Sequence, residues 1–167
     1  MGDLASTYFN QGRWNEAEQL QLEVMDMSRK LLGPEHPDTL LSMGDLASTY
    51  FNQRRWNEAE QLELQVMDMR KKLLGPEHPH TLLSIGNLAS TYFNQGRWSE
   101  AEQLQLELID MRKNLLGPEH PDTLKSMQSL TTIKKAGMRQ GRWTFKSWIR
   151  KIGKDSKNNI LVSKYKK

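Results

Sequence analysis

The stretch LASTYFNQGRW occupies Leu4–Trp14, and it returns as LASTYFNQRRW at Leu46–Trp56 and as LASTYFNQGRW at Leu88–Trp98. The spacing is 42 residues, and the segments between the copies recur in the same register, including EAEQL and LLGPEHP. A fixed period of about 20 to 50 residues is typical of stacked supersecondary units, none of which can bury its apolar face alone. The repeat therefore predicts a solenoid and argues against a domain with one central core.

Each unit is predicted to begin with a helix, as the second unit illustrates. Pro37 has a fixed φ and no N–H, which suits the first turn of a helix. Beyond it, apolar residues recur on one helical face: Leu40, Met43, Ala47 and Tyr50. We therefore expect a helix that runs from Pro37 to near Gln53.

A second helix is predicted to follow after a short turn, from near Asn57 to a stop at Gly75 and Pro76. Glu58 and Glu60 lie in its first turn, where acidic groups are favourable. Its apolar positions cover a wide arc of the helix: Ala59, Leu62, Val66, Met69 and Leu73, with Leu64, Met67 and Leu74 beyond them. One partner helix cannot cover this arc, so the second helix must also contact the first helix of the next unit.

The order Leu46, Ala47, Tyr50, a short turn and then Ala59 resembles the helix-turn-helix unit of tetratricopeptide repeats. The 42-residue length and the LLGPEHP linker resemble the kinesin-light-chain type over about residues 1–133. HEAT and armadillo arrays have similar periods but lack this Ala and Tyr spacing. The chain departs from the family where an aromatic residue is usual in the second helix: Gln21, Glu63 and Gln105.

The resemblance implies an all-α, tetratricopeptide-like solenoid of about three near-identical repeats plus a divergent C-terminal repeat. We expect units at 1–42, 43–84 and 85–126, the first of them with a truncated first helix. A degenerate fourth repeat or capping amphipathic helix is expected at 127–154, and a basic tail at 155–167.

The resemblance also implies a non-enzymatic protein-interaction scaffold, whose first helices line a concave groove for a peptide or a partner helix. Carried over by position, the groove residues are Asp3, Asp45, Asn87, Ser6, Ser48, Ser90, Phe9, Phe51, Phe93, Asn10, Asn52 and Asn94. Each Phe follows the buried Tyr and so lies about 100° around the helix from it. This predicts an aromatic ladder flanked by amides and hydroxyls. The alternative is that the phenylalanines only pack against adjacent helices.

The charge of the chain divides after Leu124. Residues 1–124 hold 11 Lys and Arg against 19 Asp and Glu, a net charge of −8, whereas residues 125–167 hold 13 against 1, a net charge of +12. An asymmetry of this size indicates an interaction tail. Apolar and basic residues at helical spacing predict a short basic amphipathic helix there: Trp143, Phe145, Lys146, Trp148, Ile149, Arg150, Lys151, Ile152 and Lys154.

Three interpretations of this basic helix stay open. It can cap the exposed side of the last unit, as terminal repeats require. It can act as a ligand-like segment held by the acidic repeats of its own or a neighbouring chain. It can bind an anionic membrane or nucleic acid. An engineered or recently duplicated array with no evolved ligand is a further, purely structural alternative.

Other function classes find no support in the sequence. There is no phosphate-binding loop, no Gly-x-Ser-x-Gly elbow and no His-Glu-x-x-His motif, so we expect no enzyme activity and no cofactor. His36, His78 and His120 occur once per unit, too far apart to share a metal ion, and either they or Asp38 and Asp122 are expected to cap the helices that follow. The chain has no cysteine and no long apolar run, so we expect a cytoplasmic protein.

Overall fold

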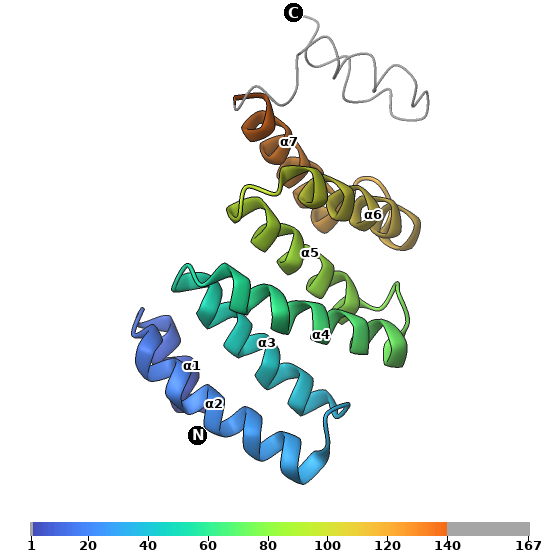
Figure 1. Ribbon diagram of the computed structural model, residues 1–167. Helices are drawn as coiled ribbons and strands as arrows, with labels where there is room; N and C mark the ends of the chain where they lie inside the picture. Colours follow the sequence, from blue (N-terminus) through green and yellow to red (C-terminus); the bar gives the residue numbers. More distant parts are fainter. Residues whose placement is uncertain (1, 140–167) are drawn as a thin grey trace, which may run out of the picture.

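The computed structural model describes residues 2–139 as a stack of seven α-helices (Figure 1). The first helices of the units, called A helices, are α1 (Gly2–Asn10), α3 (Pro37–Asn52), α5 (Pro79–Asn94) and α7 (Pro121–Arg139). The second, or B, helices are α2 (Trp14–Leu32), α4 (Trp56–Leu74) and α6 (Trp98–Leu116). Each helix packs against the next one along the chain. The predicted all-α solenoid is confirmed.

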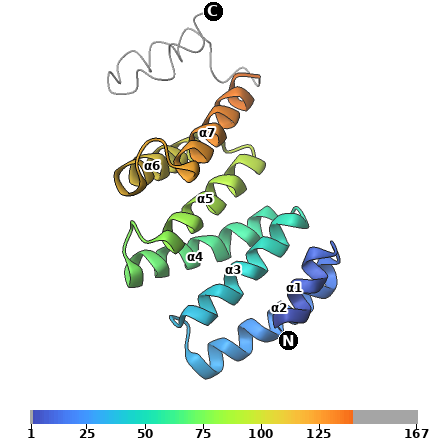
Figure 2. The same cartoon turned by 180° about the vertical axis from the view of Figure 1, so that it is seen from behind.

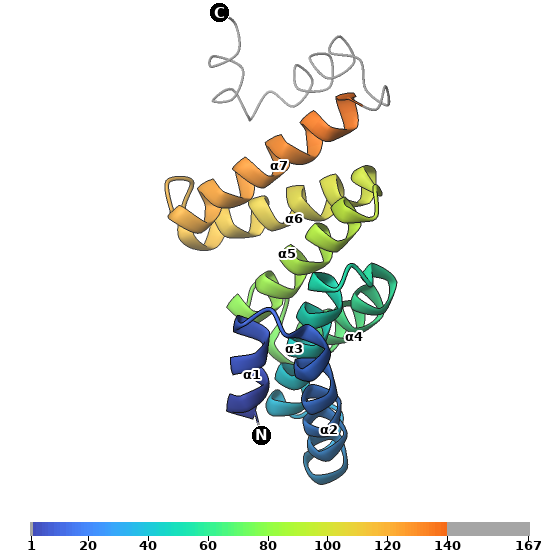
Figure 3. The same ribbon diagram turned by 90° about the vertical axis from the view of Figure 1, so that its left-hand side faces the viewer.

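The stack advances in one direction from α1 to α7. Figure 2 shows the same order from behind, and Figure 3 shows α1 and α2 at one end with α7 at the other. Helices far apart in the sequence therefore lie far apart in space. Such a molecule is stabilised by contacts inside each unit and between neighbouring units.

The apolar core is divided among the units. Leu40, Met43 and Val66 form one buried cluster from α3 and α4, and Met25 of the preceding α2 packs against it. An equivalent cluster of Leu82, Ile85 and Leu108 receives Met67 from α4, among other residues. Helix α4 thus contributes to the core of its own unit through Val66 and to that of the next unit through Met67, as the wide apolar arc predicts.

Small side chains set how closely the helices approach one another. Ala17, Ala59 and Ala101 occupy the same place in α2, α4 and α6, and each is 0% exposed. A methyl side chain at such a contact allows two helix axes to approach to roughly 8 to 10 Å. This explains why the same short residue stands at this place in all three units.

Leu73 and Leu74 differ from the sequence-based expectation. They continue the apolar arc of α4, yet they are 44% and 43% exposed. They belong to the last turn of α4, at the outer edge of the stack, where the chain leaves the helix (Figure 1). Helical periodicity continues to the end of a helix, whereas the neighbouring helix that would cover it does not.

Histidine caps the A helices. In His36, His78 and His120, Nδ1 accepts a hydrogen bond from the backbone N–H two residues later, each at 3.2 Å. This bond satisfies one of the free N–H groups of the first helical turn. Of the two capping candidates, the residue before each proline is therefore confirmed.

The turn between the A and B helices requires a positive φ. Gly12 and Gly96 have φ of 74° and 76°, and Arg54 stands at the same place in the second unit with φ of 62°. A residue with a Cβ atom is strained in this region, by about 1 kcal/mol or more. The second turn therefore carries strain that the first and third do not.

Replacing Arg54 by glycine should raise the free energy of unfolding by about 0.5 to 1 kcal/mol, because relief of strain exceeds the added entropy of the unfolded chain. Urea unfolding followed by circular dichroism measures the change. The reciprocal variant Gly96→Arg should lose a similar amount. Equal stability of all three proteins would contradict the strain at Arg54.

Candidate functional site

The predicted groove residues lie on the A helices, and none of the twelve is buried. Seven are exposed: Asp3, Ser6, Asn10, Asp45, Asn87, Ser90 and Asn94. Five are half-buried: Phe9, Ser48, Phe51, Asn52 and Phe93. The three phenylalanines thus keep part of their rings at the surface and do not belong to the buried core.

A pocket of about 300 Å³ lies among the A helices α3, α5 and α7. Four of the predicted groove residues line it: Phe51, Ser90, Phe93 and Asn94. Its remaining lining residues are Ala89, Gln105, Ser129, Thr132 and Ile133. Two aromatic rings from successive units therefore meet at one hollow, whose lining contains no ionisable side chain.

Sequence reasoning missed the wall that α7 contributes. Ser129 and Thr132 follow Asn87 and Ser90 by one period of 42 residues, so the repeat itself could have identified them. Gln105 comes from a B helix and reaches the pocket between two A helices. The other eight predicted residues do not line this pocket.

Two of the predicted groove asparagines are oriented by their own helices. Asn52 Nδ2 donates to the Ser48 carbonyl at 2.7 Å, and Asn94 Nδ2 donates to the Ser90 carbonyl at 2.8 Å. The serine hydroxyls donate to carbonyls one turn earlier, at Gly44 and Gly86. Each Asn side chain therefore keeps its Oδ1 available to accept a hydrogen bond from another molecule.

An arginine lies close to Asp45, one of the predicted groove residues. Although its side chain reaches the surface, partial loss of hydration raises the pKa of Asp45, and Arg70 of α4 opposes this effect. Arg70 Nη1 donates to Ser84 Oγ of α5 at 2.9 Å, and Arg112 repeats the contact with Ser126 Oγ of α7 at 2.6 Å. Because the first unit has Ser28 at this place, the arginine bridge exists only at the second and third junctions of the described residues.

A second arginine fastens each unit to the one before it. Arg55 lies over the ring of Tyr50, 4.2 Å from its centroid, and donates to Glu18 of the preceding B helix at 2.7 Å and to Glu58 at 3.0 Å. Gln53 Nε2 donates to the other oxygen of Glu18 at 2.8 Å. We call this arrangement the arginine clasp. It links the turn of one unit to the B helix of the previous one.

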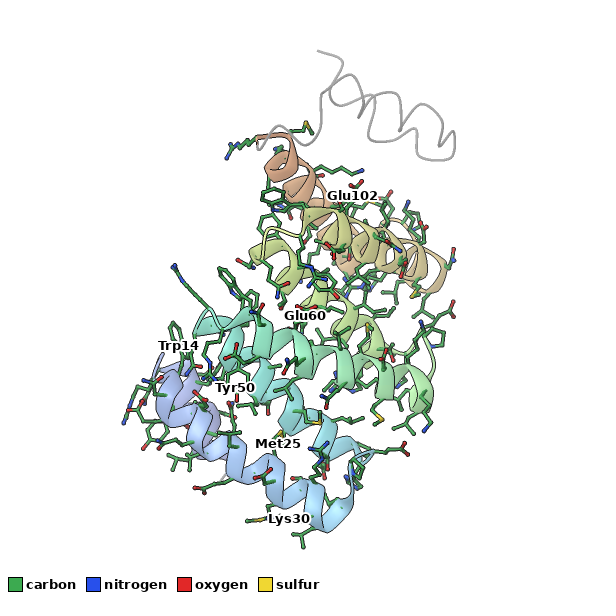
Figure 4. The ribbon with its side chains drawn as sticks, in the orientation of Figure 1. Trp14, Met25, Lys30, Tyr50, Glu60 and Glu102 are labelled. Atoms are coloured by element: carbon green, nitrogen blue, oxygen red, sulfur yellow. The ribbon has the colours of Figure 1, made fainter. Side chains whose placement is uncertain are left out.

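The clasp recurs between the second and third units and changes at α7. Arg97 lies over Tyr92 and donates to Glu60 at 2.7 Å. At the next junction Lys134 stands where Tyr92 stood, and its Nζ lies 3.5 Å from Glu102 Oε1. Glu60 and Glu102 occupy equivalent places on α4 and α6 (Figure 4). The divergent last unit thus keeps an ion pair to the same glutamate.

The remaining sequence-based predictions concern the C-terminal segment, a metal site and a membrane-spanning helix. The basic amphipathic helix at 143–154 and the tail at 155–167 lie outside the described residues. Within residues 2–139 no three His, Asp or Glu side chains come together as a metal site, and His78 stacks on His80 with ring centroids 5.4 Å apart. No helix among these residues is long and apolar enough to span a bilayer.

Comparison with solved structures shows the same architecture. The nearly identical TPR-like repeats of a protein from Podosopora anserina assigned as a kinesin light chain share 33% identity, with a TM-score of 0.75 over 84% of this chain. A variant of that protein matches with a TM-score of 0.74. BtubC (BKLC) from P. vanneervenii shares the fold at 18% identity, with a TM-score of 0.76 over 99% of this chain. The chain spans 65% and 64% of the length of the two proteins.

Family models give the same assignment. Residues 1–72 and residues 81–122 each match a model described as Tetratricopeptide repeat. No curated protein matches the sequence. Repeats of this kind generally mediate protein–protein interactions and are typically non-enzymatic scaffolds. With the seven stacked helices of residues 2–139 and its 42-residue period, the chain belongs to the tetratricopeptide repeat family, in the kinesin-light-chain-like form.

Proposed function

We propose that this chain is a non-enzymatic scaffold that binds a peptide or partner helix along the groove residues of its A helices. The observation that carries the proposal is the pocket between Phe51 and Phe93, which is open to the surface and shared by α3, α5 and α7. Two aromatic rings and Ile133 offer apolar contact, and Ser90, Asn94 and Thr132 offer polar atoms at the edge. This combination is typical of sites that hold one side chain of a partner and orient its backbone.

The lining of the pocket defines the chemistry of the side chain that it accepts. No Asp, Glu, Lys, Arg or His lines it, so a charged group would lose its hydration without gaining an ion pair. An apolar or aromatic side chain loses little on entering and removes part of the Phe51 and Phe93 rings from water. We therefore expect an uncharged anchor residue in the partner.

The test uses a displayed library of random peptides, selected on the full chain, because the natural partner is unidentified. The selected peptides should carry an apolar or aromatic residue at one position, and Phe93→Ala should weaken their binding at least about tenfold. Isothermal titration calorimetry measures the affinity. Leu83→Ala is the matched control, because Leu83 is an apolar residue of the same helix, is 50% exposed, and neither lines the pocket nor belongs to the predicted groove residues.

Two results would contradict the proposal. One is a selection that yields no specific peptide. The other is a set of peptides that bind the Phe93→Ala and Leu83→Ala variants equally well. Because α5 also carries core residues, circular dichroism must show that Phe93→Ala keeps its helical content.

The charge division supports a second candidate function. Residues 1–124 carry a net charge of −8 and residues 125–167 carry +12, so the basic end can bind the acidic repeats of its own or another chain, or an anionic membrane or nucleic acid. Binding to an anionic polymer or vesicle would fall steeply with salt. We also propose a cytoplasmic location, because a chain without cysteine suits a reducing compartment.

A further inference from the structure

Three equivalent polar side chains lie buried where each B helix meets the next A helix. Gln21, Glu63 and Gln105 are 7%, 6% and 4% exposed, and they stand exactly one period apart. They face α3, α5 and α7 respectively. A buried polar group needs a hydrogen-bond partner at such a place, and the three junctions meet this requirement differently.

At the first and third junctions the buried group is a neutral amide with a partner. Thr49 Oγ1 donates to Gln21 Oε1 at 2.6 Å. Gln105 Nε2 donates to the Ser126 carbonyl at 2.9 Å, and Ile133 stands where the first two junctions have threonine. Both junctions therefore bury an uncharged and paired group.

The middle junction holds a carboxyl group instead. Thr91, which is 0% exposed, is the counterpart of Thr49, but neither its Oγ1 nor Glu63 Oε2 has a hydrogen-bond partner. A carboxylate can only accept hydrogen bonds, whereas a protonated carboxyl also donates through its O–H, as the amide of glutamine donates through its N–H. One bound proton would thus give Glu63 the hydrogen-bonding character of its two counterparts.

The charged neighbours favour the protonated form. On α4 itself the neighbour that acts on Glu63 is the carboxylate of Glu60, one turn earlier. From the turn after α5, Arg97 donates to Glu60 and not to Glu63. From α3, Asp45 interacts with Arg70. Among the described residues, Glu63 has no cation of its own.

The titration of Glu63 agrees with this geometry. Burial raises the pKa of Glu63 to about 7 and Glu60 adds to the rise, whereas the nearby Thr91 hydroxyl, which forms no hydrogen bond here but could donate to a carboxylate, acts against it. An ordinary glutamate has a pKa of 4.5. The junction therefore contains a carboxyl group that exchanges its proton near neutral pH.

We propose that the junction between α4 and α5 is a proton-operated joint, in which protonated Glu63 holds the two helices together and ionised Glu63 loosens them. Ionisation would place an unpaired charge, 6% exposed, between two packed helices. The α2–α3 and α6–α7 junctions, with Gln21 and Gln105, do not respond in this way. The joint is independent of what the groove binds.

The sign of the effect on stability follows from the two pKa values. The unfolded chain releases this proton near pH 4.5, whereas the folded chain retains it until about pH 7. Stabilisation by protonated Glu63 is therefore complete below pH 4.5, declines as the pH rises through this window, and is lost above it. The folding equilibrium constant should fall roughly 100-fold across the window on account of this group alone.

The test compares the full chain with Glu63→Gln, which restores the residue of the other two junctions. Urea unfolding is measured at several pH values between about 4.5 and 8. The ratio of the wild-type folding constant to that of Glu63→Gln should fall roughly 100-fold with rising pH. Glu23→Gln, at an exposed position on α2, is the control and should show no such fall against the wild type. A constant ratio for Glu63→Gln would overturn the proposal.

Two further measurements do not depend on that variant. Carbon-13 NMR of the Glu63 carboxyl in the folded wild type should give a titration midpoint near pH 7, and a midpoint near 4.5 would overturn the proposal. Gln21→Glu, which leaves Glu63 in place, should add a second pH-dependent junction between α2 and α3 and so make the fall in stability with rising pH steeper than in the wild type. A Gln21→Glu variant whose stability follows that of the wild type at every pH would count against the joint.

Discussion

Replacing Leu88 by alanine should lower the free energy of unfolding by about 3 kcal/mol. Leu88 is 1% exposed and is among the largest fully buried side chains of the described residues. Truncation removes its apolar contacts and leaves a cavity in a well-packed region, because the neighbouring helices can only partly collapse into the space. Urea unfolding of the wild type and the variant measures the loss.

The same substitution at Leu4 is a matched control for Leu88→Ala. Both leucines begin the stretch LASTYFNQGRW, so the residues that follow them are identical. Leu4 is 49% exposed, because within the described residues no B helix precedes α1. Leu4→Ala should therefore cost less than about 1 kcal/mol. Similar losses at the two positions would show that local sequence, and not stacking, decides the contribution of each leucine.

Replacing Ala101 by leucine should cost about 3 kcal/mol or more and separate α6 from its neighbours. Ala101 is 0% exposed at the contact between helices, where a larger side chain has no space. The extra carbon atoms force either a shift of the backbone or strained side-chain rotamers. Because every unit depends on its neighbours, the damage should also reach the contact of α6 with α7.

Ser99→Leu is the control for Ala101→Leu. Ser99 is exposed and lies two residues earlier on the same helix, so the added side chain meets only water there. Its effect should stay within about 0.5 kcal/mol. Differential scanning calorimetry would show a lower melting temperature for Ala101→Leu alone. An unchanged melting temperature for Ala101→Leu would show that the helices can move apart at little cost.

Much of the fold could be predicted because the same helix-forming pattern occurs three times in the sequence. Pro37 and Pro79 mark the starts of A helices, and the positions of Ala59 and Ala101 mark close contacts between helices. A periodic pattern also identifies which residues share a helical face, so the groove residues on the A helices are found outside the core. These features depend on local sequence and on a repeat distance, both of which can be read directly.

Features that depend on contacts between units could not be predicted in the same way. Glu63 differs from Gln21 by a single group, and its unpaired oxygen is evident only when Thr91 of the next unit is in place. The arginine clasp joins Arg55 to Glu18, which is 37 residues earlier. For Leu73 and Leu74 the apolar pattern predicts contact with a neighbouring helix, yet both side chains are exposed, because the pattern does not reveal where the covering helix ends.

The pocket at α7 has a consequence for how a partner would be positioned along the molecule. A surface that repeats every 42 residues offers several equivalent alignments, so a partner that fits one unit could equally be shifted by a whole unit. The α7 wall breaks this translational symmetry, because Ser129 replaces the Asp45 and Asn87 of earlier units and Ile133 replaces threonine. One alignment of the proposed partner would then differ in energy from the others, and α7 would become the reference point from which position along the array is measured.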